Sequence, residues 1–131
     1  YILLYFDGIM TKIKIKAGDV ELEGELTDTE CAEKIKENLP FESGFQIWGD
    51  EFYFSIGLKL GLDETAKQEV EVGTIGYWPS GEALAIFFGP TPASSGDKPM
   101  AASDVNVVGK VENAEKLKDA KDAEKIMVEE V

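Results

Sequence analysis

Residues 73–92 read GTIGYWPSGEALAIFFGPTP, and this stretch decides the fold class. Its centre, residues 83–88, is wholly apolar, which is typical of a short strand buried on both faces. The Pro-Ser-Gly sequence at 79–81 predicts a turn before this strand, and the Pro- and Ser-rich residues 90–99 predict a long loop after it. The aromatic pair before the turn ends another strand, expected over residues 70–78. The stretch therefore predicts two strands joined by a tight turn.

Two upstream segments alternate between apolar and charged residues, with the period of a half-buried strand. Residues 11–16 place isoleucines on one face and lysines on the other, and residues 20–26 place apolar residues or glycine opposite glutamates. The Ala-Gly-Asp sequence at 17–19 predicts a turn between them. We therefore expect a hairpin in which the lysine face and the glutamate face are cross-strand neighbours on the solvent side.

The rest of the chain predicts two short helices and several further strands. The sequence Thr-Asp-Thr-Glu at 27–30 has capping-box spacing and is expected to open a helix through Asn38, which Pro40 ends. Residues 58–69 are loop-like, and Asn113 is expected to cap the second helix. The further strands are expected at residues 44–48, 51–56, 104–111 and 125–131.

These elements predict an all-β fold, a closed antiparallel barrel of about eight strands with two short helices. The length favours a single domain over residues 1–131. Residues 1–10 lack an initiator methionine, a basic flank and a cleavage site, so we interpret them as a trimmed start or a remnant of expression rather than a signal peptide.

The charge and the residue types argue against several classes of function. The net charge is −13 at pH 7, from 26 acidic and 13 basic residues. Such a field repels phosphate groups, so we expect neither nucleic-acid nor membrane partners. All 13 basic residues are lysines, and the chain has no histidine. The one cysteine, Cys31, has no partner for an internal disulfide and no histidine base, which favours a packing role and a cytoplasmic location.

One segment matches the spacing of a calcium-binding loop. Asp19, Glu21, Glu23, Gly24 and Glu30 fall at the first, third, fifth, sixth and twelfth positions of that template. Long glutamate side chains at the third and fifth positions overfill the coordination sphere, and the preceding residues are patterned as a strand. We therefore prefer an amphipathic strand that leads into a helix, and we expect no metal or cofactor.

Several segments resemble cyclophilins. Residues 85–89, Ala-Ile-Phe-Phe-Gly, resemble the buried cyclophilin strand that bears paired phenylalanines, and residues 106–111 resemble the cyclophilin strand His-Val-Val-Phe-Gly-Lys-Val. The motifs GYWPSG at 76–81 and FFGPTP at 87–92 are similar to those of the small cyclophilin-like proteins of archaea and bacteria. The resemblance extends from about Thr11 onward and implies a cyclophilin-like barrel.

The resemblance also implies a chemistry, because cyclophilins catalyse prolyl isomerisation. Rotation about an Xaa-Pro bond crosses a barrier of about 18–20 kcal/mol, and cyclophilins are known for an arginine that pulls on the prolyl nitrogen beside a hydrophobic cup. Phe88 matches a phenylalanine of that cup, and Asn106 falls where the family has its histidine, but the chain has no arginine. Gln46 is the nearest positional candidate, and a neutral amide lacks the charge and the planar fork of a guanidinium. Efficient isomerase activity is therefore not expected.

The leading hypothesis is a binding module that holds a peptide or a small molecule in a barrel groove without the cyclophilin catalytic centre. The expected groove residues are Gln46, Trp48, Tyr53, Phe88 and Asn106, with the aromatic side chains for apolar contact and the amides to orient the ligand. Packing across a hairpin explains Trp48 and Tyr53 equally well. The alternatives are a weak or divergent prolyl isomerase and a regulatory or structural subunit that binds a protein partner.

Overall fold

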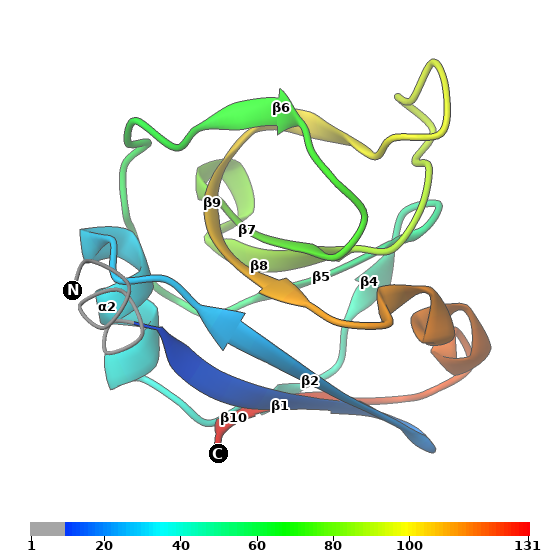
Figure 1. Ribbon diagram of the computed structural model, residues 1–131, viewed down its shortest axis with the longest axis horizontal. Coiled ribbons are helices and arrows are strands. Elements are labelled where there is room, and N and C mark those ends of the chain that lie inside the picture. Colours follow the sequence, from blue (N-terminus) through cyan, green and yellow to red (C-terminus); the bar gives the residue numbers. More distant parts are fainter. Residues whose placement is uncertain (1–9) are drawn as a thin grey trace, which may run out of the picture.

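The computed structural model describes residues 10–131, whose ten strands form one curved antiparallel sheet (Figure 1). The hydrogen-bonded order is β3-β10-β1-β2-β9-β7-β8-β5-β4, and β6 pairs with β9 beside this path. The strands are β1 (Thr11–Ala17), β2 (Val20–Leu26), β3 (Phe41–Ser43), β4 (Gln46–Ile47), β5 (Glu51–Ser55), β6 (Lys67–Glu69), β7 (Thr74–Trp78), β8 (Ala83–Phe87), β9 (Met100–Val111) and β10 (Ile126–Glu130). Residues 1–9, on which most of the expectation about the start of the chain falls, lie outside the described residues.

The all-β, antiparallel prediction is confirmed, but the closed barrel of about eight strands is wrong in both closure and strand number. The order begins at β3 and ends at β4, and no ladder pairs these two edges within residues 10–131. The edge strands are three and two residues long, and only Gly44 and Phe45 separate them in sequence. Strands this short offer few backbone groups for a ladder. The two edges are therefore connected along the chain, through Gly44 and Phe45, and not by strand pairing.

The expected hairpin of lysine-bearing and glutamate-bearing strands is confirmed by β1 and β2. Lys14 lies opposite Glu23, and Lys16 lies opposite Glu21. The Nζ atom of Lys14 is 3.6 Å from a carboxylate oxygen of Glu21, diagonally across the ladder. Asp19 lies in the turn. The calcium-like spacing therefore belongs to an amphipathic hairpin, as the strand interpretation requires.

The first helix begins two residues later than its capping-box sequence predicts. The helix α2 (Glu30–Glu37) is capped by Thr29, whose hydroxyl accepts a hydrogen bond of 3.1 Å from the backbone N–H of Ala32. The hydroxyl of Thr27, the expected cap, instead donates to the carbonyl oxygen of Val108 on β9 at 3.2 Å. That tertiary bond attaches the end of β2 to the sheet and leaves the capping role to Thr29.

Two other expectations need correction. The second helix is a 3-10 helix, η2 (Ala114–Ala120), and Asn113 precedes it at a φ of 58° without a side-chain capping bond. The expected loop at 58–69 contains the exposed strand β6, which pairs with β9 at long range and has no alternation in its own sequence. A third short helix, η1 (Pro79–Gly81), forms the expected turn before β8.

No helix described in residues 10–131 is long and apolar enough to cross a membrane.

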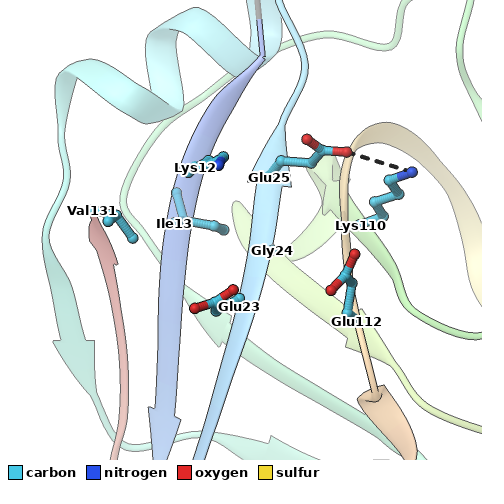
Figure 2. Close-up of a pocket in the computed structure, with 8 residues that line it drawn as sticks. All are labelled: Lys12, Ile13, Glu23, Gly24, Glu25, Lys110, Glu112 and Val131. Carbon is cyan, nitrogen blue, oxygen red and sulfur yellow. Dashed lines mark ion pairs between the residues drawn. The ribbon is translucent and has the colours of Figure 1, made fainter. Parts of the chain in front are cut away.

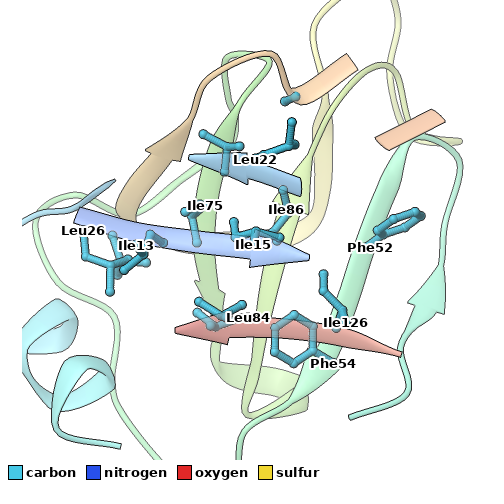
Figure 3. Packing of buried hydrophobic residues seen from close by; sticks show 14 of the residues in the cluster. Ile13, Ile15, Leu22, Leu26, Phe52, Phe54, Ile75, Leu84, Ile86 and Ile126 are labelled. Atoms are coloured by element: carbon cyan, nitrogen blue, oxygen red, sulfur yellow. The ribbon is translucent and has the colours of Figure 1, made fainter. Parts of the chain in front are cut away.

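The main core lies on the concave side of the curved sheet. Figure 3 shows side chains from opposite parts of the sheet pointing toward one another, with Ile13 and Ile15 of β1 facing Phe52, Leu84 and Ile86 of β5 and β8. Each of these five side chains is at most 1% exposed. Burial of one such side chain contributes about 1.5–3 kcal/mol, so this cluster is the main source of fold stability.

Strand β8 is buried on both faces, as its wholly apolar sequence predicts. Leu84, Ile86 and the following Phe88 belong to the main core, whereas Ala85 and Phe87 belong to a second cluster on the other face of the sheet. The other buried members of this outer cluster are Val70, Ala101 and Val105. The outer cluster therefore joins residues from β8, β9 and the end of the β6 segment.

The long segment between β5 and β6 is held by two buried polar side chains. Tyr77 and Asn106 are cross-strand neighbours on β7 and β9, and both are fully buried. The Asn106 side chain accepts a hydrogen bond from the N–H of Asp63 at 2.8 Å and donates one to the carbonyl of Gly61 at 2.9 Å. The hydroxyl of Tyr77 accepts from the N–H of Leu60 at 3.0 Å. These bonds replace the regular ladder that this segment lacks.

Asn106→Ala is expected to lower the free energy of unfolding by about 2 kcal/mol, because it removes a fully buried side chain and its two hydrogen bonds to the segment. Asn38→Ala is the matched control, since the Asn38 amide donates to an exposed helix carbonyl, and its expected cost is below about 0.5 kcal/mol. Urea denaturation of both variants checks the difference. Equal losses would show that Asn106 does not anchor the segment.

Candidate functional site

A polar pocket of about 300 Å³ lies on the outer surface of β1, β2 and β9 (Figure 2). It surrounds Gly24, where a Cβ atom would lie 2.6 Å from the carbonyl oxygen of Lys110, so the glycine allows β2 and β9 to approach closely. The Nζ atom of Lys110 is 3.4 Å from the carboxylate of Glu25, in an exposed ion pair worth at most about 1 kcal/mol. The other charged lining residues, all exposed, are Lys12, Glu23 and Glu112. This pocket is a solvated face of the hairpin, with charges of both signs.

A second, aromatic pocket of about 160 Å³ lies on the other face of the sheet from the main core, beside the outer cluster. The β4–β5 hairpin, the end of β7 and the first half of β9 form its walls. Its lining residues are Trp48, Glu51, Tyr53, Trp78, Ala101, Ala102 and Val105. An apolar concavity with one convergent polar group is the usual form of a small-ligand site.

Small residues on β7 and β8 leave room for this pocket. Ala85 is the cross-strand partner of both Tyr53 on β5 and Gly76 on β7, so these three positions share the outer face. A Cβ atom on Gly76 would lie 2.8 Å from a methyl carbon of Val105, which shows that Val105 packs on the glycine backbone. The small residues therefore leave a depression at the centre of the outer face, and aromatic side chains surround it.

Trp78 is fixed in place on two sides. Its indole N–H donates a 2.7 Å hydrogen bond to the hydroxyl of Ser103. A Cβ atom on Gly81 would lie 2.8 Å from two carbons of the indole, so the ring rests on the backbone of the turn. The rings of Trp78 and Tyr53 meet edge to face, with centroids 5.7 Å apart and an interplanar angle of 78°. Trp78 thus both supports the turn and forms a wall of the pocket.

An irregularity in β9 shapes the other wall. Between their two paired positions, β6 has one residue, whereas β9 has four, residues 101–104. The side-chain amide of Gln68 donates to the carbonyl of Ala101 at 2.9 Å and holds the bulged segment. The bulge presents Ala101 and Ala102 to the pocket and Ser103 to the indole. Bulges of this kind are common beside functional sites, because they redirect side chains.

The one carboxyl group of the pocket belongs to Glu51. Its side chain is 5% exposed, and the Oε1 atom has no hydrogen-bond partner among the described residues. The ladder places Phe87 directly opposite Glu51, and Tyr53 follows two residues later on the same face. On the hairpin, the N–H of Trp48 donates to the carbonyl of Glu51 at 2.9 Å. Aromatic residues therefore flank Glu51 across the ladder, on its own strand and on the hairpin.

Burial raises the pKa of Glu51 from 4.5 to about 8, because an apolar surrounding disfavours the charged form. With a pKa of about 8, the carboxyl group carries its proton in most molecules at neutral pH. Among the described residues, the Oε1 atom of Glu51 has no such partner as the neighbouring Asp50 has, whose side chain accepts a 2.8 Å hydrogen bond from the Nζ atom of Lys121. A strongly perturbed acid in a concave site is a common property of functional residues.

The structure brings three of the five expected groove residues to the face of this pocket. Trp48 and Tyr53 line it. Gln46 is the cross-strand partner of Tyr53, so it lies on the same face, but it is exposed at the edge strand and outside the lining set. Tyr53 is therefore paired across the ladder with Gln46, and Tyr53 and Trp48 both line the pocket.

The other two expected groove residues lie elsewhere. Phe88 is 1% exposed in the main core, where its ring packs edge to face on Phe52 with centroids 4.8 Å apart. The partner in the pair, Phe87, faces the outer cluster instead. Asn106 is fully buried and bonded to the segment between β5 and β6, so both of its polar ends are occupied. Neither Phe88 nor Asn106 therefore lines the aromatic pocket.

The expected groove residues include neither Glu51 nor Trp78, although both line the pocket. Residues 51–55 alternate as Glu-Phe-Tyr-Phe-Ser, so the strand pattern places Glu51 on the same face as Tyr53. The cover of that face comes from Ala101 and Val105, which are distant in sequence. The pairing of Glu51 with aromatic neighbours at positions 48 and 53 is the feature that could have pointed to it.

Cys31 and the acidic residues form no competing site in the part of the chain that the structure describes. Cys31 is buried, and burial raises the pKa of its thiol. Its Sγ atom lies 3.4 Å from the amide nitrogen of Asn106. Residues 10–131 contain no cluster of three or more cysteine, aspartate or glutamate side chains that could hold a metal ion.

Comparison with known proteins places the chain in a family. The family model described as cyclophilin-like matches residues 11–129. The solution structure of the hypothetical protein AF2241 from Archaeoglobus fulgidus is similar, with 35% sequence identity, a TM-score of 0.76, and coverage of 94% of this chain and 96% of that one. No curated protein matches the chain. Since the family model spans nearly all of the described sheet, this chain belongs to the cyclophilin-like family.

Proposed function

We propose that this cyclophilin-like protein is a ligand-binding module and that its site is the aromatic pocket between the β4–β5 hairpin, β7 and β9. The observation that carries the proposal is the carboxyl group of Glu51, which is buried, faces the pocket and has no partner among the described residues. A buried polar group without a partner costs about 1–3 kcal/mol. A ligand that supplies the missing partner recovers that free energy on binding.

The remaining lining residues supply apolar contact and little else. Trp48, Tyr53 and Trp78 provide large ring surfaces, and the indole of Trp78 is already positioned before a ligand arrives. A volume of about 160 Å³ corresponds to about five water molecules at their liquid volume. The ligand is therefore a small molecule, or one side chain of a peptide, rather than an extended polypeptide.

The pocket does not favour efficient prolyl isomerisation. Its lining set includes no lysine, and the chain contains no arginine that could pull on a prolyl nitrogen. A protonated Glu51 is a neutral donor, which is weaker than a guanidinium. None of the described contacts favours the weaker isomerase or the partner-subunit alternative. The cytoplasmic location and the absence of nucleic-acid and membrane partners stay predictions from composition.

Ligand binding can be read from intrinsic fluorescence, because both tryptophans of the chain, Trp48 and Trp78, line the pocket. We expect at least one of a panel of small amines, alcohols, carboxylic acids and Xaa-Pro dipeptide amides to shift the emission saturably. Ala102→Phe fills the pocket from an exposed position and should abolish the response. Ala93→Phe, in the exposed loop after β8, is the matched control and should retain it. Binding that survives Ala102→Phe would place the site elsewhere.

The buried carboxyl group also has a consequence for stability. Between pH 4.5, the ordinary pKa, and about 8, the value in the folded protein, only the folded state holds the proton of Glu51. The free energy of unfolding therefore falls as pH rises through this range, by at most about 1.4 kcal/mol per pH unit from this group. Glu51→Gln cannot ionise, so its stability relative to the wild type should rise from pH 5 to pH 8 and then level off.

Denaturation curves at a series of pH values measure this difference, with Glu42→Gln, an exposed glutamate on β3, as the control. The control is expected to run parallel to the wild type across the range. If the Glu51→Gln curve were also parallel to the wild type, the carboxyl group would not be buried and protonated in the folded protein.

A further inference from the structure

We infer that the aromatic pocket binds an organic ammonium ion that carries methyl-sized apolar groups, with Glu51 as its counter-charge. This inference rests on the proposed binding function and names the chemical class of the ligand. It depends on the arrangement of the rings, on the position of the carboxyl group and on the absence of basic residues from the lining set.

The rings form a corner that suits a cation. Tyr53 and Trp78 meet at 78°, and Trp48 adds a second indole to the lining. Aromatic faces carry negative partial charge, so they attract ammonium groups and disfavour carbonyl or carboxylate oxygens. A neutral ligand that accepts a hydrogen bond from Glu51 would have to place its oxygen among these faces. A cation is attracted by the rings and stabilises the ionised form of Glu51, so its binding releases the proton of this carboxyl group to solvent.

No cation of the protein occupies this position among the described residues. The Oε1 atom of Glu51 has no partner there, and the lysines closest in sequence or contact to the pocket segments, Lys98 before β9 and Lys121 on Asp50, pair with other carboxylates. Lys121 pairs with Asp50 at 2.8 Å, and Lys98 pairs with Glu71 at 3.1 Å. The net charge of −13 further favours the approach of a positively charged ligand.

The size of the pocket limits the headgroup. A volume of about 160 Å³ accommodates a compact group such as trimethylammonium, whose methyl groups contact the rings while its charge stays near the carboxylate. An unsubstituted ammonium ion would leave much of the ring surface without contact. A methylated headgroup therefore matches the lining better than a bare amine.

Choline and 3,3-dimethylbutan-1-ol test the inference, because the two molecules share their shape and differ in charge. At pH 8.5, where Glu51 is mostly ionised, we expect choline to bind at least about tenfold more tightly, as judged by tryptophan emission and calorimetry. Glu51→Gln should weaken choline binding by about tenfold or more and leave the binding of the alcohol within about twofold. Glu42→Gln should change neither.

The outcomes separate the inference from the function on which it rests. Equal binding of the two molecules, or choline binding that is unaffected by Glu51→Gln, would overturn the ammonium inference and leave the binding site in place. Failure of both molecules, together with failure of the wider panel, would overturn the binding function as well. A trimethyl-lysine peptide identifies the source of the headgroup: tighter binding than choline assigns it to a modified protein, and weaker binding assigns it to a free small molecule.

Discussion

Burial of β8 on both of its faces is the constraint on which the rest of the structure depends. On one face Leu84 and Ile86 meet β1 and the aromatic residues of β5 in the main core. On the other face Ala85 and Phe87 must also be removed from water, and this requires a second layer. A single layer of sheet would leave this outer face open to solvent. The first half of β9, together with β6 and Val70, covers the outer face, and the pocket is the part that this cover leaves open.

The cover over the outer face also explains why an acid is buried here. Glu51 lies opposite Phe87 and shares the outer face with Tyr53, so the same cover that hides Phe87 also hides the carboxyl group. The protein accepts a protonated carboxyl group, with a pKa near 8, at a position where an apolar residue would be more stable. Natural proteins tolerate such a local loss of stability mainly where the group acts on a ligand. The bulge at residues 101–104 has the same character, since it breaks a regular ladder and shapes one wall of the pocket.

Local patterns were sufficient to predict the strands whose two faces differ or are both apolar, such as the β1–β2 hairpin and β8. The cyclophilin resemblance was sufficient for the family. The predictions that were wrong concern features set by contacts between residues that are distant in sequence. Thr27 bonds to Val108 instead of capping a helix. The sheet ends at two strands that are too short to pair. Only part of the candidate pocket follows from the sequence patterns, for the same reason. Trp48 and Tyr53 follow from the hairpin, but the direction of the Phe87–Phe88 pair and the burial of Glu51 are set by β9.

The proposed site depends on Glu51 being an enclosed, protonated acid in a pocket that is open to a ligand. The most direct test is a titration of the glutamate side-chain carboxyl carbons by ¹³C NMR, with Glu51→Gln used to assign the resonance. We expect the Glu51 resonance to titrate with a pKa of about 8, and to titrate at lower pH in the presence of a cation that occupies the pocket. A pKa near 4.5, the ordinary value, would show that the carboxyl group is solvated, and it would contradict both the proposed site and its mode of binding.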